Sequence, residues 1–214
     1  MTPREMRAWI AGKLDPIETY DPAKRIIHSD FDLNPTEGPT QAQTERALSP
    51  AAVLVPLVEH EAGVTVLLTR RADTLRNHTG QVAFPGGRCD PGELPWETAL
   101  REAQEEIGLD PAHVTIAGLS SAYQTGSGFD ITPVVGFVPP GCALSPNPHE
   151  VADIFEAPFA FLMDPDNHAQ QFFEVADGAR RFFYAMNYQE RQIWGATAGM
   201  LRALYERLYG ARAA

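Results

Sequence analysis

Carboxylates recur at short spacings in the run GRCDPGELPWETALREAQEEIGL, which extends from Gly87 to Leu109. Most of the run has the pattern of one helix, in which each residue turns by about 100°. Glu102, Glu105 and Glu106 then fall within roughly one quadrant of the helix surface. The far side carries an apolar stripe, made of Trp96, Leu100, Ala103 and Ile107. We expect one face to pack on a core and the other to meet something strongly positive.

The acidic face has an electrostatic cost that a divalent cation would remove. Glu102 and Glu106 are like charges four residues apart, which destabilises a helix by roughly 0.2–0.5 kcal/mol. They also lie in the later turns, where the helix dipole disfavours anions, because the helix is predicted to end at Gly108. An ordinary solvated acidic face is the simpler alternative. Hard oxygen ligands on a rigid helix favour Mg²⁺ or Mn²⁺, which also bind phosphate oxygens of a substrate.

The same residues resemble the Nudix box. That box is a glycine, five residues, a glutamate, seven residues, Arg-Glu, an aliphatic or small residue, any residue, Glu-Glu, any residue, a glycine and an aliphatic residue. Gly87, Glu93 and residues 101–109 fill every fixed position. The resemblance to Nudix hydrolases implies cleavage of nucleoside diphosphates linked to another group. It also implies a loop–helix–loop motif within an α/β/α sandwich with a mixed sheet.

The resemblance also implies roles for individual residues. Glu102, Glu105 and Glu106 would bind the divalent metal, with the carbonyl of Gly87 nearby. Arg101 and Glu93 would hold the geometry of the motif by a charge-assisted pair.

The catalytic base stays open between two glutamates. Glu105 is a ligand or the base, and Glu150, which follows a loop rich in proline and glycine, is a second candidate for the base. A charged strand end is an equal explanation of Glu150.

The segment before the box indicates a substrate. Residues 67–87 read LLTRRADTLRNHTGQVAFPGG and resemble the signature of the coenzyme A pyrophosphatase branch, although Ala72 stands where that branch usually has serine. Two further stretches are similar to the branch, EVADIFEAP from Glu150 and IWGATA from Ile193. The branch implies hydrolysis of coenzyme A to 3′,5′-ADP and 4′-phosphopantetheine, or of a derivative to acyl-phosphopantetheine.

Basic residues and glycines near the box are the candidates for substrate binding. Arginine binds phosphate in a bidentate manner, and coenzyme A carries a diphosphate bridge and a 3′-phosphate. Glycine lets the backbone approach an oxygen closely. The candidates are Arg71, Arg76, Gly86 and Arg88.

The same motifs are consistent with two other functions. One is a Nudix pyrophosphatase acting on ADP-ribose, NADH or other nucleoside diphosphate derivatives. The other is a Nudix-like ligand-binding module without catalysis, although such modules tend to lose box glutamates and none is lost here.

Composition limits the remaining choices. The chain has 214 residues and a net charge of −11, so we expect no broad binding of nucleic acid, and we expect a small-molecule partner. The N-terminus does not read as a secretory signal, and no run of 18 apolar residues appears, so we expect no membrane association. The two cysteines give no disulfide framework, which favours a cytoplasmic enzyme. A homodimer is left open.

One α/β domain is expected over residues 51–210, with an N-terminal helix and an irregular arm (residues 1–50) packed on it. The helix is predicted to begin with Thr2 as cap and proline as its first residue, and the arm covers residues 28–50. A long loop is expected over residues 139–149 and a helical turn over 160–163, and a C-terminal helix over 192–208. Strands are predicted over residues 51–58, 64–69, 81–84, 114–122, 131–138, 151–155, 171–176 and 179–185.

Overall fold

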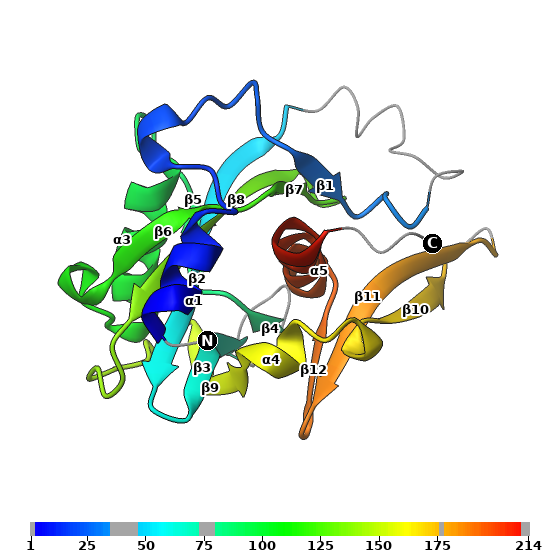
Figure 1. The fold of residues 1–214 in the computed structure, drawn as a ribbon. Coiled ribbons are helices and arrows are strands. Elements are labelled where there is room, and N and C mark those ends of the chain that lie inside the picture. The colour runs from blue at the N-terminus through cyan, green and yellow to red at the C-terminus, as the bar shows by residue number, and fades with distance from the viewer. Residues whose placement is uncertain (1–2, 35–46, 73–79, 176–177, 211–214) are drawn as a thin grey trace.

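The computed structural model describes residues 3–34, 47–72, 80–175 and 178–210. Its centre is a nine-stranded mixed sheet built around β2 (Ser49–His60), as Figure 1 shows. Strand β2 runs parallel to β8 (Phe129–Val138) and antiparallel to β3 (Gly63–Arg71) and β5 (Gly86–Arg88). The other strands of this sheet are β1 (Ile27–Ser29), β4 (Val82–Ala83), β6 (Thr115–Leu119), β7 (Ala122–Gln124) and β9 (Val151–Pro158).

Helices cover both faces of the sheet because β2 is apolar on both sides. Its Val53, Val55 and Leu57 belong to one core cluster, together with apolar residues of α1 (Pro3–Ala11) and α5 (Ala196–Tyr209). The alternate residues Ala52 and Leu54 belong to a second cluster with α3 (Pro95–Ile107). The predicted α/β/α sandwich with a mixed sheet is confirmed. In the described part of the chain, no helix is long and apolar enough to span a membrane.

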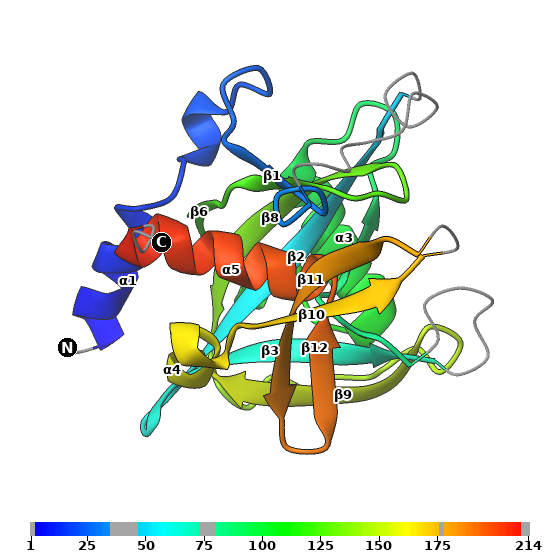
Figure 2. The same cartoon turned by 90° about the vertical axis from the view of Figure 1, so that its right-hand side faces the viewer.

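A second, three-stranded antiparallel sheet lies beside α5 (Figure 2). It consists of β10 (Ala169–Glu174), β11 (Arg180–Tyr188) and β12 (Arg191–Trp194). The strands predicted over residues 171–176 and 179–185 are present as β10 and β11, which pair antiparallel, and Gly178 between them has a φ of 83°. The prediction of a helix from residue 192 is wrong at its start, because Arg191–Trp194 pairs with β11 and Gly195, at a φ of 63°, ends the strand.

The N-terminal region is more regular than the sequence indicated. Helix α1 begins at Pro3, and Thr2, its predicted cap, lies outside the described residues. The arm was predicted to be irregular from residue 28, yet Ile27–Ser29 pairs with β7 as a parallel strand. Side-chain Asn34 exchanges two hydrogen bonds with the backbone of Phe182, at 2.9 and 2.7 Å, and so binds the arm to the second sheet.

Four short helical segments complete the fold over the described residues, and one predicted strand is divided. The expected turn near residue 160 is α4 (Phe159–Leu162), and the 3₁₀ turns are Ile17–Thr19, Pro111–His113 and Pro165–Asn167. The single strand predicted over 114–122 is wrong, because the chain leaves β6 and re-enters the sheet as β7. A register shift beside Gly118, whose φ is 147°, marks the irregularity in β6.

Gly199 gives a stability test of the packing of α5. A Cβ at this position would lie 2.5 Å from Tyr123 Cζ, whose hydroxyl donates to Asp30 at 2.9 Å. Helix propensity alone favours alanine over glycine by about 1 kcal/mol. We expect Gly199→Ala instead to destabilise the fold by about 1–3 kcal/mol through overpacking, and to lower Tm by several degrees. A rise in Tm would contradict this, because it would show that the Tyr123 ring can move away from the added methyl group without loss of stability.

Candidate functional site

Helix α3 is held at both ends by local hydrogen bonds. At its start, Glu97 Oε2 accepts from the Leu94 amide at 2.8 Å, and proline occupies the first position. At its end, Gly108 adopts the left-handed conformation with φ 68°, and its N–H donates to Gln104 O at 2.9 Å. This confirms the predicted end of the helix, since glycine takes this conformation without strain.

The buried side of α3 is rotated from the predicted stripe. Ala103 and Ile107 are buried as expected, but Leu100 is half-exposed and Ala99 is fully buried in its place. Small residues at 99 and 103 allow the helix to lie close to the sheet. The rotation brings Glu106 to the inner side, where only 4% of its surface is exposed.

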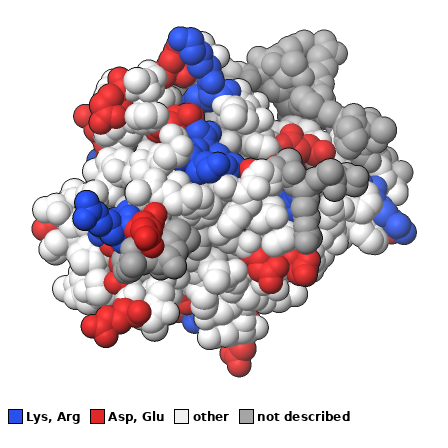
Figure 3. Space-filling model, viewed as in Figure 1, with Lys and Arg blue, Asp and Glu red and all other residues white. Residues whose placement is uncertain are grey.

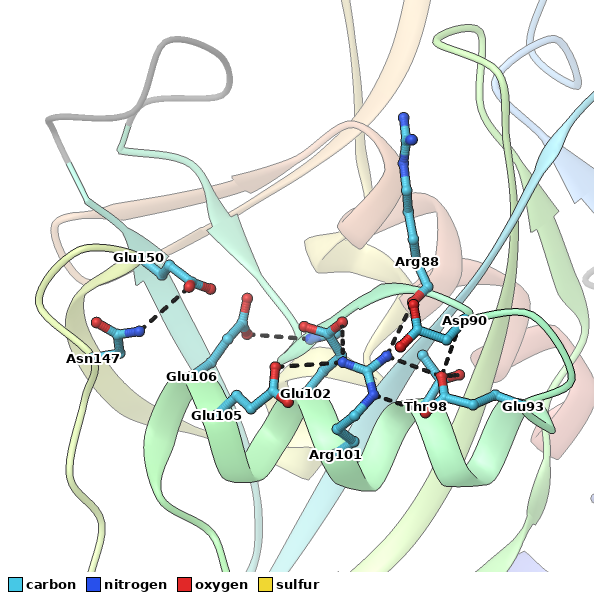
Figure 4. Close-up of polar contacts among 11 residues, drawn as sticks. Arg88, Asp90, Glu93, Thr98, Arg101, Glu102, Glu105, Glu106, Asn147 and Glu150 are labelled. Atoms are coloured by element: carbon cyan, nitrogen blue, oxygen red, sulfur yellow. Dashed lines mark hydrogen bonds and ion pairs between the residues drawn. The ribbon is translucent and has the colours of Figure 1, made fainter.

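Arg101 joins the acidic groups at the middle of α3 (Figure 4). Its guanidinium donates to Glu93 at 2.8 and 3.0 Å and to Glu102 Oε1 at 2.8 Å. It also reaches the carbonyl of Arg88 at 3.1 Å and lies 3.4 Å from Glu105 Oε2. The hydrogen bonds from Arg101 lower the pKa of Glu93 to about 2, with help from the Asp90 amide and the Thr98 hydroxyl. The Arg101–Glu93 contact that the resemblance implied is therefore formed.

Glu106 is an ionisable group in an unfavourable position. Burial raises its pKa to about 7, and the charges of Glu102 and Glu150 act in the same direction. The Gly86 amide, which donates to Glu106 Oε2 at 3.2 Å, and the charge of Arg71 oppose the rise only in part. A cation bound beside Glu106 would stabilise the ionised carboxylate and so offset the unfavourable effect of its burial.

Glu102 lies against the glycine turn, by which we mean the bend at Pro85 together with Gly86 and Gly87 at the start of β5. Burial raises the pKa of Glu102, although hydrogen bonds from Arg101 oppose the shift. A Cβ at Gly87 would stand 2.7 Å from Glu102 Oε2, so only glycine leaves room for the carboxylate there. The backbone of β5 and the carboxylates of α3 are therefore in direct proximity.

A loop from the other end of the sheet brings Glu150 to the same place. The amides of Ser145 and Asn147 donate to the carbonyls of Ile107 and Glu106, each at 2.8 Å. The Ala72 amide donates to the carbonyl of Glu150 at 2.8 Å. These bonds fix the long loop before β9 across the C-terminal end of α3.

The carboxylates fit a divalent cation, but they are not gathered around one point. Within the described ranges, no three carboxylate, imidazole or thiolate groups converge as metal ligands do. Arg101 accounts for this arrangement, because it holds Glu102 and reaches Glu105, whose side chain is 58% exposed. The fit rests on Glu106 and Glu102, two carboxylates whose pKa is raised by burial beside a third acid.

A cavity of about 660 Å³ adjoins the glycine turn on the side of α5. Arg71, Arg88, Gly86 and Gly87 line it, and Arg76 lies outside the described residues. Arg71 Nε is buried and has no hydrogen-bond acceptor among the described residues, whereas the exposed Arg88 lies 5.2 Å from the Phe129 ring centroid. Two of the basic residues that the sequence selected, Arg71 and Arg88, thus line the same cavity.

Most of the cavity wall was not predicted. The arm, α5 and the second sheet supply side chains that the sequence did not select as site residues, and the IWGATA stretch from Ile193 was the available signal. Examples are Asp30, Tyr123, Arg181, Phe183, Trp194 and Arg202. Figure 3 shows acidic and basic residues interspersed on the face drawn there, without a continuous basic surface over its described residues.

Comparison with known proteins gives consistent matches. The sequence model of the NUDIX domain matches residues 48–187. The chain is 40% identical over 160 residues to an uncharacterized Nudix hydrolase, NudL, of Photorhabdus laumondii, covering 74% of this chain and 84% of that protein. It is 38% identical over 180 residues to NudL of Pectobacterium atrosepticum, covering 84% and 90%. Among solved structures, a Nudix hydrolase from M. Smegmatis, RenU, aligns with a TM-score of 0.47 at 24% identity, over 56% of this chain and 76% of that one.

The raised pKa of Glu106 predicts a pH-dependent loss of stability. Below its ordinary pKa of 4.5 the carboxyl is protonated in both states, so it has no effect on folding. Between pH 4.5 and about 7 the unfolded chain ionises first and the fold loses stability, and above this range the loss is constant. In metal-free protein at pH 8, Glu106→Gln should therefore raise stability by about 1–3 kcal/mol, with a smaller gain at pH 5.

Thermal unfolding in a chelator at both pH values measures this effect. Glu105→Gln is the matched control, because that carboxylate is mostly exposed and its replacement should change Tm little. Equal Tm values for wild type and Glu106→Gln at pH 8 would contradict a buried, ionised Glu106.

Proposed function

This chain belongs to the Nudix hydrolase family, and we propose that it hydrolyses the diphosphate bond of coenzyme A or its derivatives. The observation that carries the proposal is the buried Glu106, which accepts from the Gly86 amide, while Gly86 itself lines a cavity that Arg71 and Arg88 also line. The carboxylates suit Mg²⁺ or Mn²⁺, and the arginines suit phosphate groups.

Glu102 and Glu106 would hold the metal, with Glu105 and the carbonyl of Gly87 completing its ligands. When bound, the metal neutralises charge that develops on the diphosphate and lowers the pKa of the attacking water. Arg101 and Glu93 have a positioning role, since their contacts fix the turn before α3 relative to the glutamates.

The substrate would lie with its diphosphate at the glycine turn. Arg71 and the exposed Arg88 both line the cavity, where their guanidinium groups would bind phosphate oxygens. Gly86 presents its amide toward the same place, already directed at Glu106. The neutral part of the substrate would then extend toward the aromatic part of the cavity, where Phe183 and Trp194 lie.

Glu150 is the proposed base, and Glu105 is the other candidate. In the reaction, a water oxygen attacks one phosphorus, its proton passes to the carboxylate, and the bridging P–O bond breaks. Each product keeps one of the two phosphates, which gives 3′,5′-ADP and 4′-phosphopantetheine from coenzyme A. Glu105 is directed toward Arg101, whereas the Glu150 backbone is fixed at the end of α3, so the geometry favours Glu150.

A substrate comparison tests the proposal. With Mg²⁺, we expect coenzyme A to release 3′,5′-ADP with a kcat/KM at least about tenfold above that for ADP-ribose or NADH, since only coenzyme A offers a 3′-phosphate to the arginines. Products are identified by chromatography and mass spectrometry. A similar rate of AMP release from ADP-ribose would overturn the coenzyme A assignment and leave the broader Nudix activity in place.

A second measurement tests the metal ligands. Glu106→Gln should lower metal-dependent kcat by about 10³-fold or more while the fold is retained, because the metal supplies several kcal/mol of transition-state stabilisation. Glu174→Gln, an exposed glutamate on β10, is the control and should keep wild-type activity. Near-normal turnover by Glu106→Gln would refute the assignment, and binding of coenzyme A without any turnover by wild type would indicate a non-catalytic module.

A further inference from the structure

The peptide unit of Asn147 is fixed between α3 and the start of β9. Its N–H donates to the carbonyl of Glu106 at 2.8 Å. Its carbonyl accepts from the amides of Glu150 at 3.0 Å and Val151 at 2.8 Å. The position of Asn147 is therefore set by backbone bonds that do not depend on its side chain.

The side chain of Asn147 makes two further contacts of different kinds. Its Oδ1 accepts from the His149 amide at 3.1 Å, which supports the turn. Its Nδ2 donates to Glu150 Oε1 at 3.3 Å, as Figure 4 shows. The half-buried amide thus supports the loop with one atom and holds the Glu150 carboxylate with the other.

The Glu150 carboxylate lies near two other carboxylates of the site, and the Asn147 amide is a neutral donor to it. The charge of Glu150 acts on both Glu102 and Glu106, so it lies close enough to be pushed away by them in turn. Arg101 makes its contacts with Glu93, Glu102 and Glu105 further along the helix. Asn147 carries no charge, so its amide restrains Glu150 without neutralising it.

We propose that Asn147 is a positioning residue, which holds the Glu150 carboxylate toward the attacking water. This inference rests on the proposed function, in which Glu150 accepts the proton of that water. It adds that the base is tied to the metal-binding helix through one residue, whose backbone contacts Glu106 and whose side chain contacts Glu150.

Two substitutions separate positioning from support of the loop. Asn147→Ala keeps all three backbone bonds and removes both side-chain contacts. Asn147→Asp keeps the acceptor for the His149 amide but places a carboxylate oxygen against Glu150 instead of a donor. A role in the turn alone predicts that the aspartate variant behaves as wild type, whereas a positioning role predicts that it is at least as impaired as the alanine variant.

Steady-state kinetics with Mg²⁺ on coenzyme A and on ADP-ribose provide the test. We expect kcat to fall about 10- to 100-fold in Asn147→Ala and at least as far in Asn147→Asp, with KM within about twofold of wild type. Glu150→Gln should lower kcat about 10²- to 10⁴-fold, and adding Asn147→Ala to it should cause little further loss. Thermal unfolding confirms that each variant is folded.

Several outcomes would overturn the proposal. They are wild-type kcat in Asn147→Ala, wild-type kcat in Asn147→Asp, an active Glu150→Gln, and losses that multiply in the double variant. Failure of the proposed function gives a different result, because wild type would then hydrolyse neither substrate. Turnover of ADP-ribose but not coenzyme A would count against the substrate assignment alone and would still allow the Asn147 comparison.

Discussion

Burial of the Glu106 carboxylate against the sheet is the constraint on which the site depends. Small residues on α3 bring the helix close to β2, and β5 pairs with the same strand. Glu106 is thereby placed beside the Gly86 amide with little contact with water. A single hydrogen bond and a nearby arginine do not compensate for the lost hydration, which is why the pKa of Glu106 rises. The protein keeps an uncompensated acid where a cation can bind.

The other groups of the motif fix the helix that carries Glu106 against the segment that precedes it. Arg101 links the turn before the helix to the helix itself, through the carbonyl of Arg88 and the carboxylate of Glu93. Gly87 is required because the carboxylate of Glu102 occupies the space that a side chain would need. The spacing of the motif therefore has a direct physical explanation, since Arg101 contacts Glu93, and Glu102 contacts Gly87, across the loop–helix junction.

The rest of the fold decides what reaches these groups. The second sheet and α5, which follow each other in the sequence, and the distant N-terminal arm all line the cavity beside the glycine turn. Gly199 lets α5 approach Tyr123, and Asn34 attaches the arm to β11. The proposed specificity for coenzyme A rests on this cavity, and the proposed chemistry rests on the helix and its loops.

The sequence alone determined the chemistry of the site and the class of the fold. The motif spacing identified the glutamates, Arg101, Glu93 and the end of α3 at Gly108, because these features depend on contacts within some twenty residues. The sequence did not predict that α3 is rotated so that Glu106 faces inward and Leu100 is half-exposed. This rotation depends on how closely the helix packs on β2. The strand at Arg191–Trp194 was likewise set by pairing with β11, which local propensity does not reveal. Tertiary structure also decided the cavity wall and the backbone bonds that fix the Asn147 loop to α3, because both join segments whose proximity arises only when the sheet is assembled.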